Sequence, residues 1–437
     1  MRRFDGLKNA YKMVTCYIGI GSNLGDRENN IKKALTLLHG CLNTEVEKAS
    51  AFYETQPQGC PGNAGRFLNA AAKIKTAFSP RELLRQLQSI EKQLGRIRPG
   101  KRNSSRSIDL DILFYNNQKI SLPSLKIPHP RLRQRAFVLK PLKEIAPETI
   151  RSLAKETKII STLSGMRGFI AKEKAQNMTI GFVPTMGFLH EGHLSLIRQA
   201  KKDCDTCVVS IFVNPIQFGP QEDYKKYPRD LEQDSILAKS AGASCVFYPN
   251  AKDMYPPDYL TYVNVEKITD YLCGASRPGH FKGVATVVTK LFNIIQPHIA
   301  YFGQKDYQQA LVIRKMVEDL NMPITIKTMP IVRECDGLAM SSRNAYLTTQ
   351  ERADAVVLYQ SLQKAREMVR QGQHDARIIK TAIKTAILKK KTAKIEYISV
   401  ADARTLEDRE VFRQKTLIAL AVWIGRTRLI DNIIIEV

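Results

Sequence analysis

Two different spacings of hydrophobic and polar positions run along the chain, and the first third predicts an α+β domain. Runs typical of strands lie at 14–20, 44–53, 67–75 and 108–114. Helical spacing follows a Gly/Asn-rich turn and ends near residue 38, and it recurs at 79–94. The resulting βαββαβ order predicts an antiparallel sheet with helices packed on one face.

From residue 179 onward, strands alternate with helices. Strands are predicted at 179–183, 208–213, 245–248, 299–302 and 324–332, and helices at 194–202, 281–295 and 307–320. This alternation predicts a parallel sheet whose ligands lie beyond the carboxyl ends of its strands.

The last hundred residues have a different pattern. A capping-box spacing from Thr348 to Glu351 begins a long helix, and a second helix precedes strands at 395–400, 416–422 and 429–436. We expect a smaller α+β domain here that acts as a lid.

The length of 437 residues predicts about two to four domains. The pattern divides the chain into an N-terminal extension, an α+β domain, a short linker, an α/β domain and a C-terminal domain, at 1–12, 13–150, 151–160, 161–344 and 345–437.

Composition and charge narrow the class of protein. Hydrophobic residues make up 43% and charged residues 25%, as in globular proteins. No uncharged apolar stretch approaches the ~18 residues that a membrane span needs. The net charge is +25, and residues 1–156 carry 28 basic and 13 acidic side chains, or +15. This excess indicates anionic partners, either nucleic acid or a polyphosphate ligand.

The eight cysteines are scattered, which favours a reduced, cytoplasmic protein over a disulfide framework. Cys204 and Cys207 form a CxxC pair without a second pair, so we interpret them as structural rather than as half of a zinc site.

Asp109 and Asp111 lie at i and i+2 on an apolar strand, so both carboxylates project from one face. Mg²⁺, which prefers oxygen ligands and arrives with a nucleotide, would relieve their repulsion. Five cations precede them in a loop, as transfer from ATP requires: Arg96, Arg98, Lys101, Arg102 and Arg106. The alternative is an Asp pair held in salt bridges at a strand end.

These residues stand among several ordered motifs, and residues 14 to about 148 resemble the 6-hydroxymethyl-7,8-dihydropterin pyrophosphokinases of folate biosynthesis. The resemblance is carried by Tyr17–Asp26, Phe52–Thr55, Phe67–Ala70, Glu91 with Gly95 and Arg96, Arg106–Leu113, Pro128–Arg131 and Phe137. It implies a ferredoxin-like domain that transfers pyrophosphate from ATP to the hydroxymethyl pterin. By the same resemblance, Asp109 and Asp111 hold magnesium, ATP contacts Glu91, Arg96, Arg106, His129 and Arg135, and the pterin contacts Thr55, Phe67, Asn69 and Phe137.

His190 and His193 are spaced i and i+3 at the predicted start of a helix. Free N–H groups and the helix dipole favour anions there, so two potential cations suit a phosphate. A zinc site is the competing interpretation, but no third ligand is obvious nearby. HxGH therefore indicates nucleotidyl transfer, in which it stabilises charge developing on the phosphates. Downstream, Met340–Arg343 supplies two hydroxyls and a guanidinium that suit pyrophosphate.

Residues 158 to 437 resemble pantothenate synthetase. The motifs are Pro184–Gly187, His190–His193, Phe212–Phe218, Tyr227–Arg229, Ser276–Val284, Phe302–Gln309 and Asp336–Asn344. The resemblance implies a Rossmann-like nucleotidyltransferase domain that joins pantoate to β-alanine through pantoyl adenylate. It also implies a homodimer.

This second resemblance carries roles for individual residues. It makes His193 the proton donor and places His190, Lys305, Ser341 and Arg343 on the ATP phosphates. Gly303, Asp306 and Val332 surround the nucleoside, and pantoate contacts Gln217, Gln309 and Asn214. The remaining positions of the expected ATP site are Met186, Gly187, Phe188, Leu189, Glu191, Gly192, Gln304, Met340 and Ser342. Met186 also lines the pantoate pocket. For Ser276–Gly283, a tight loop without a role in binding stays open as an alternative, because Pro and Gly form turns in any case.

Three hypotheses follow for the whole chain. In the first, it is a bifunctional enzyme of two independent halves that use Mg²⁺ and ATP. In the second, only the ligase half is active, because Asn103, Ser104 and Ser105 replace the aromatic or Gly-Pro pair common in the pyrophosphokinase loop. In the third, the chain binds nucleic acid through its +25 charge. The sequence argues against this hypothesis, because it has no aromatic-rich basic repeat or docking motif. We expect no nucleic-acid or membrane partner.

Overall fold

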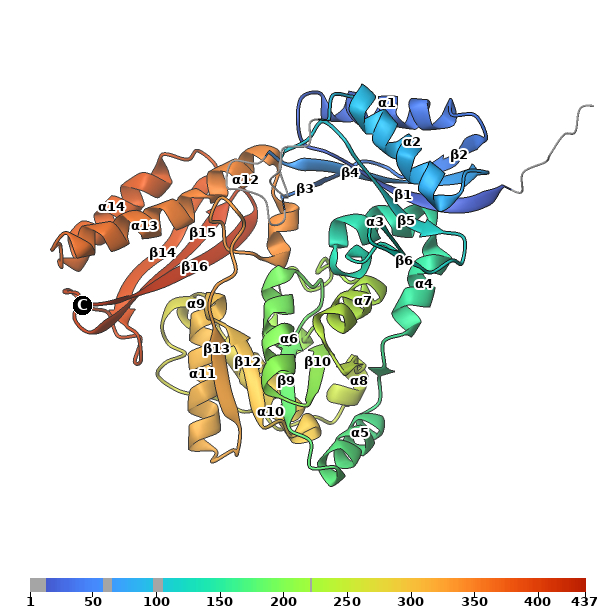
Figure 1. Cartoon of the computed structure of the whole chain (residues 1–437). Coiled ribbons are helices and arrows are strands. Elements are labelled where there is room, and N and C mark those ends of the chain that lie inside the picture. Colours follow the sequence, from blue (N-terminus) through green and yellow to red (C-terminus); the bar gives the residue numbers. More distant parts are fainter. Residues whose placement is uncertain (1–12, 58–64, 97–104, 221) are drawn as a thin grey trace, which may run out of the picture. The chain divides into compact units, whose positions relative to one another are not determined.

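The computed structural model describes residues 13–57, 65–96, 105–220 and 222–437 (Figure 1). The chain divides into two compact units, and the boundary lies between Lys155 and Glu156. The expected extension at 1–12 and loop residues Arg98, Lys101, Arg102, Asn103 and Ser104 lie outside the described residues.

The first unit combines an antiparallel sheet with four α-helices in its described part. Its strands are β1 Val14–Ser22, β2 Thr44–Ala49, β3 Tyr53–Thr55, β4 Phe67–Thr76, β5 Asp109–Tyr115, β6 Ile120–Leu122 and β7 Leu125–Ile127. Its helices are α1 Arg27–His39, α2 Pro80–Gln93, α3 Ala136–Ile145 and α4 Pro147–Lys155, with a 3₁₀ turn, η1, at Leu132–Gln134.

The strand order of the main sheet is β2-β4-β1-β5, every neighbouring pair is antiparallel, and β3 also pairs with β4. α1 and α2 cover one face and bury Ile31 and Leu87 against strand residues such as Ile18 (Figure 1). Ser79 begins α2 with a capping box to Glu82. α3 packs on the opposite face against β4, so the expectation that helices cover only one face was wrong.

The second unit begins with an α/β layer. Its strands are β8 Ile159–Ile160, β9 Ile180–Thr185, β10 Thr206–Ile211, β11 Cys245–Phe247, β12 Ile299–Gly303 and β13 Thr325–Met329. Its helices are α5 Leu163–Ala175, α6 Glu191–Asp203, α7 Leu231–Ala241, α8 Ala251–Met254, α9 Leu272–Ser276, α10 His280–Ile295 and α11 Tyr307–Asp319, with 3₁₀ turns η2 Pro215–Gln217 and η3 Gln304–Asp306.

These six strands form one parallel sheet in the order β13-β12-β9-β10-β11-β8. The predicted parallel sheet is confirmed. Its core includes Phe182, Phe247 and Phe292, all buried. The chain passes from β9 to β10 and β11 on one side and returns to β12 on the other. The carboxyl ends of β9 and β12 therefore form a topological switch point, where open α/β sheets bind ligands.

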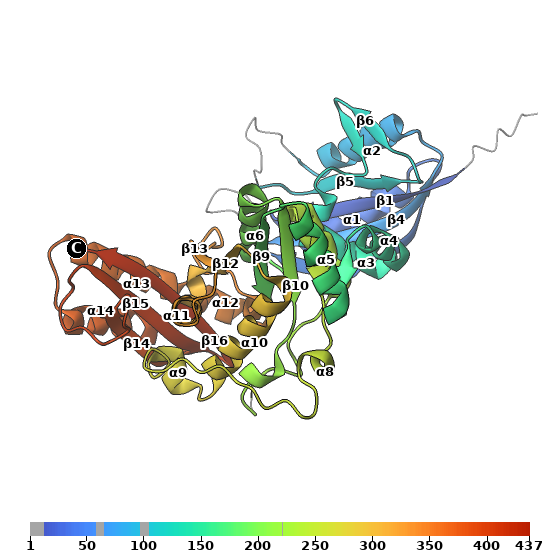
Figure 2. The same cartoon turned by 90° about the horizontal axis from the view of Figure 1, so that it is seen from below.

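The C-terminal part has its own hydrophobic core. η4 Ser342–Tyr346 and α12 Thr349–Ala355 lead into α13 Val357–Arg370 and α14 Ala376–Leu388, which are followed by β14 Ala393–Asp402, β15 Lys415–Ile424 and β16 Thr427–Glu436. The three strands form an antiparallel sheet in the order β14-β15-β16. α13 and α14 lie on one face of it, as Figures 1 and 2 show from two directions.

Tertiary packing changes several predicted elements. The strand expected at 44–53 is broken into β2 and β3, and the strand expected at 324–332 ends at Met329, before Pro330. Part of the expected linker 151–160 is the end of α4, which buries Leu153 and Ala154, and another part is β8. α3, α5 and α7 were not predicted.

Two further findings concern the CxxC pair and the absence of a membrane-spanning helix among the described residues. Cys204 and Cys207 are buried, Cys204 lies 3.7 Å from the Tyr301 hydroxyl, and burial raises the pKa of the Cys207 thiol to about 12. Among the described residues, no helix is both long and apolar enough to cross a membrane.

Candidate active sites

The histidine pair lies at the amino terminus of α6, directly beyond the carboxyl end of β9. His190 is the N-cap residue, and its Nδ1 accepts a hydrogen bond from the Gly192 N–H at 3.2 Å. Nδ1 of His193 accepts one from the His190 N–H at 3.3 Å. The two ring centroids lie 4.1 Å apart, and the ring planes are tilted by 40°. Because both Nδ1 atoms accept, each neutral ring carries its proton on Nε2.

Electrostatics change the expected charge of this pair. Burial and the positive charge of Lys305 lower the pKa of His193 to about 4. Burial, His193 and Lys305 also lower the pKa of His190 well below its usual value. The lowered pKa values differ from the expectation of two potential cations. Near neutral pH the pair offers two neutral N–H donors at a helix amino terminus.

Lys305 supplies the positive charge from η3, immediately after β12. Its Nζ lies 3.0 Å from Asp306, and although burial raises the pKa of Asp306, the charge of Lys305 lowers it overall. The turn is held from behind by Asn432 on β16, whose side-chain amide donates to the carbonyls of Gln304 and Lys305, both at 3.0 Å. The C-terminal sheet thus contacts the backbone that carries Lys305.

The Met340–Arg343 motif lies across from the histidines. The Ser342 hydroxyl donates to the Phe188 carbonyl at 3.3 Å, which ties this motif to the loop before His190. Arg343 forms a bidentate ion pair with Asp223 at 2.9 and 3.1 Å. The Met340 N–H donates to the carbonyl of Val332 at 3.0 Å. In the structure, therefore, the Arg343 guanidinium is directed by Asp223, and a phosphate would compete with or extend that pair.

The residues expected to hold pantoate lie beyond β9 and β10 and on α11. Asn214 donates to Gln217 at 3.0 Å and to the Gly283 carbonyl at 3.1 Å, and Nε2 of Gln217 lies 3.2 Å from the Met186 sulfur. A Cβ at Gly283 would lie 2.5 Å from the Ile216 carbonyl oxygen. Ser276–Gly283 is therefore more than a tight loop, because its last glycine permits close packing against the Asn214–Gln217 segment. Gln309 is partly buried on the first turn of α11.

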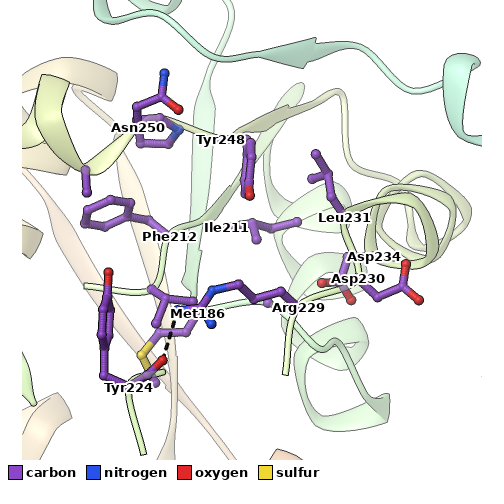
Figure 3. Close-up of a pocket in the computed structure, with 14 residues that line it drawn as sticks. Met186, Ile211, Phe212, Tyr224, Arg229, Asp230, Leu231, Asp234, Tyr248 and Asn250 are labelled. Atoms are coloured by element: carbon purple, nitrogen blue, oxygen red, sulfur yellow. Dashed lines mark hydrogen bonds between the residues drawn. The ribbon is translucent and has the colours of Figure 1, made fainter. Parts of the chain in front are cut away.

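Met186 also lines a small cavity (Figure 3). Its volume is about 150 Å³, and residues from β10, from the segments flanking it and from the start of α7 line it, including Ile211, Arg229 and Asp234. The Arg229 guanidinium is engaged by the Tyr224 carbonyl at 3.0 Å. The cavity is below the usual size of a substrate pocket, and neither histidine lines it.

In the first unit, β5 places its two aspartates opposite glycines of β1. Asp109 pairs with Gly21 and Asp111 with Gly19, while Leu110 is buried on the face covered by α1 and α2. Asn23 directly follows β1 and holds the segment that leads into β5, since its side-chain oxygen accepts a hydrogen bond from the Arg106 N–H at 2.7 Å.

Several cations converge on these carboxylates. Arg96 contacts Asp109 at 2.6 Å and also pairs with Glu91, which is buried and accepts from the Leu110 N–H at 2.9 Å. Arg106 contacts Asp109 at 2.5 Å. His129 and Arg135 each lie 3.9 Å from Asp111.

The two aspartates differ in their surroundings. Burial and the negative charge of Asp109 raise the pKa of Asp111 to about 6. Burial and Arg135 lower the pKa of His129 to about 4. Asp111 is therefore a carboxylate that a further cation would stabilise in its charged form.

This donor set fits Mg²⁺ bound together with phosphate. The two carboxylates supply oxygen ligands on one face, and Mg²⁺ usually takes one or two carboxylates plus water and phosphate oxygens. Among the described residues, no cluster of three or more His, Cys, Asp or Glu side chains forms a metal site. The phosphates of a nucleotide would have to complete the coordination.

The residues expected to bind pterin gather at the β3–β4 pair. Thr55 lies opposite Phe67 in the register, and the Asn69 amide donates to the Thr55 hydroxyl at 2.7 Å. Phe67 lies under the Arg106 guanidinium at 5.7 Å. Phe137 begins α3 and lies under the Arg135 guanidinium at 5.4 Å. Two aromatic rings thus flank arginines that also approach the aspartates.

Comparison with known proteins identifies both halves. The family model for pantoate-beta-alanine ligase matches residues 158–434, well over half of the chain. The chain belongs to the pantoate-beta-alanine ligase family. The model for 7,8-dihydro-6-hydroxymethylpterin-pyrophosphokinase matches residues 17–147, so the chain is a fusion of the two domains.

Relatives of the ligase domain match along their full length. The pantothenate synthetases of Acetivibrio thermocellus and Moorella thermoacetica are 56% and 53% identical, over 64% of this chain and 100% and 99% of their own. The crystal structure of pantothenate synthetase from Thermus thermophilus is 44% identical with a TM-score of 0.61, covering 63% of this chain and 99% of that one. The ligase from Francisella tularensis, solved with β-γ ATP and β-alanine, is 37% identical with a TM-score of 0.53, covering 63% and 97%.

Within the ligase domain, most expected residues lie together, and a few are directed elsewhere. His193, Lys305, Asp306 and Arg343 lie near enough to influence one another's charges. Glu191 points along α6 and pairs with Arg198, as an exposed helix residue does.

Sequence reasoning missed the residues that hold the ligase site in place. Asp223 directs Arg343, Asn432 holds the Lys305 turn, and Asp431 beside it pairs with Arg333. One signal was available, since Asp431 and Asn432 interrupt an otherwise apolar strand. Nothing in the local pattern marked Asp223.

Proposed function

We propose that the ligase domain makes pantothenate from pantoate, β-alanine and ATP. In the first step a pantoate carboxylate oxygen attacks the α-phosphorus of ATP, which forms pantoyl adenylate and releases pyrophosphate. In the second, the β-alanine amine displaces AMP and loses a proton. The observation that carries this proposal is the pair of adjacent neutral histidines beside Lys305 at the switch point of the sheet.

Each group has a task in this chemistry. The Nε2–H groups of His190 and His193, with Lys305, donate to phosphate oxygens as negative charge develops on the leaving pyrophosphate. The resemblance makes His193 the proton donor, but we propose that it acts as a neutral hydrogen-bond donor, because a neutral imidazole keeps its Nε2 proton near neutral pH. Gln217 and Gln309 hold pantoate, with Asn214 ordering Gln217. The names of the relatives and the nucleotide and β-alanine bound to the Francisella ligase support this assignment.

We propose a second activity for the first unit, on a ferredoxin-like sheet. It transfers pyrophosphate from ATP to the hydroxyl of 6-hydroxymethyl-7,8-dihydropterin and releases AMP. Asp109 and Asp111 would hold Mg²⁺, which neutralises phosphate charge when bound. Arg96, Arg106, Arg135 and His129 bind the phosphates, and Phe67 and Phe137 stack on the pterin ring. The family model and the raised pKa of Asp111 support this activity.

One pair of variants tests both proposals in the full chain. Asp111→Ala is expected to abolish AMP release with the pterin and to leave pantothenate synthesis unchanged, and His193→Ala is expected to do the reverse. The alternative, an inactive first unit, predicts no pterin-dependent AMP release by the unaltered chain with Mg²⁺ and ATP. Loss of both activities in either variant would contradict two independent sites.

The proposed setting of the enzyme is the cytoplasm, where the scattered cysteines stay reduced. We also propose a homodimer formed through the ligase half. Light scattering at micromolar concentration tests this assembly, and a monomer would exclude it.

A further inference from the structure

The loop that leads from β9 to the histidines has an unusual backbone. Gly187 has φ +88° and Phe188 has φ +53°, so two consecutive residues adopt the left-handed conformation. Glycine adopts it freely, but a residue with a side chain does so at a cost. Phe188 is therefore held in this conformation by its surroundings, and its position sets where the chain enters His190 and α6.

The group that holds the loop is Asp234 on α7. One of its carboxylate oxygens accepts from the Phe188 N–H at 2.8 Å and the other from the Leu189 N–H at 2.7 Å. Asp234 is 1% exposed. Hydrogen bonds from a backbone N–H to a buried carboxylate are strong, and losing the acceptor leaves a buried donor unpaired.

The surrounding residues fit this contact closely. A Cβ at Gly187 would lie 3.0 Å from the Asp234 carboxylate, so glycine leaves the room that this approach needs. On its other side, the Phe188 carbonyl accepts from the Ser342 hydroxyl. Figure 3 shows Asp234 and Leu231 on the same helix beside the cavity, with Met186 at the start of the loop.

We infer that Asp234 is a positioning residue of the ligase site. Its carboxylate holds Phe188 and Leu189 so that the Nε2–H groups of His190 and His193 face the ATP phosphates. It acts through the backbone and touches no substrate. This inference rests on the proposed ligase function, because it concerns the geometry that this reaction uses.

The test is Asp234→Asn in the full chain, which preserves shape but replaces one accepting oxygen by an NH₂ group. We expect kcat/KM for ATP in pantoate-dependent pyrophosphate release to fall about 30- to 100-fold, the factor for one charge-assisted hydrogen bond. Adding Phe188→Gly is expected to restore about tenfold, because glycine removes the left-handed penalty. Phe188→Gly alone completes the double-mutant cycle. A role only in the packing of α7 predicts no such recovery.

The control is Asp230→Ala, which removes the side-chain cap of the same helix, where Asp230 accepts from the Gln233 N–H. It is expected to lower the melting temperature while the specific activity is retained. If Asp234→Asn does not fold, Asp234→Glu displaces the carboxylate and is expected to show the same partial recovery.

The outcomes separate the two claims. An unaltered chain that forms no pantothenate refutes the proposed function. In that case, faster amide exchange at Phe188 and Leu189 in Asp234→Asn still supports the inference that Asp234 holds this loop, and unchanged exchange overturns it. With an active parent, activity of Asp234→Asn within threefold of it, or no recovery with Phe188→Gly, overturns the inference.

Discussion

Asn432 lies in the C-terminal sheet, yet its loss is expected to impair ATP use. It is 3% exposed, and its amide donates to the carbonyls of Gln304 and Lys305, both at 3.0 Å. Asn432→Ala removes both hydrogen bonds to the carbonyls of this partly buried turn. At about 1 kcal/mol for each hydrogen bond, the loss is about 2 kcal/mol. If the turn that carries Lys305 moves as a result, this corresponds to a decrease of about 30-fold in kcat/KM for ATP.

The assay is steady-state pyrophosphate release with saturating pantoate, normalised to folded protein. The control is Ser361→Ala, because Ser361 is also buried in the C-terminal part and donates to the Leu358 carbonyl at 2.8 Å, within α13. Both variants are expected to melt at lower temperature, but only Asn432→Ala is expected to lose kcat/KM. Equal activity of the two variants would refute the view that this sheet positions Lys305.

Three further outcomes are expected. Gly283→Ala places a Cβ 2.5 Å from the Ile216 carbonyl oxygen, so the KM for pantoate is expected to rise about 5- to 150-fold, for about 1–3 kcal/mol of overpacking, and an unchanged KM would contradict the packing argument. Glu91→Gln removes the buried charge that orients Arg96, so the KM for ATP in the pterin reaction is expected to rise several-fold while ligase kinetics serve as the internal control. The pKa values of His129, His193 and His280 are lowered to about 4, so the unfolded chain binds more protons between pH 6.5 and 4, and the free energy of unfolding is expected to fall as the pH drops through this range. Urea titrations at pH 7 and 5 measure this, and equal stabilities would contradict it.

The same low pKa values bear on catalysis. The acid limb of the pH profile of kcat/KM for ATP reports the free enzyme. With His193 neutral down to about pH 4, this limb is expected near pH 4 rather than near 6.5. A limb near 6.5 would mean that Lys305 and burial do not depress the His193 pKa.

Local chemistry made much of the molecule predictable. The apolar repeats predicted the parallel sheet, and the i, i+2 spacing placed Asp109 and Asp111 on one strand face, because alternation in a strand is a local property. The start of a helix at the HxGH motif was also predicted correctly, because the helical spacing that follows it is a local property. α7 was missed, since buried polar residues such as Gln233 and Asp234 obscure its pattern.

What the sequence by itself determined was therefore the parallel sheet of the second unit and the family of each domain, together with a set of candidate phosphate-binding residues. Tertiary structure alone decided the protonation of the histidines, because burial and a lysine more than a hundred positions away set their pKa values. It also decided which side chains hold the backbone before His190 and around Lys305 in place. Asp234 accepts hydrogen bonds from N–H groups, and Asn432 donates to carbonyls, that are distant in sequence. Such contacts exist only after the chain has folded.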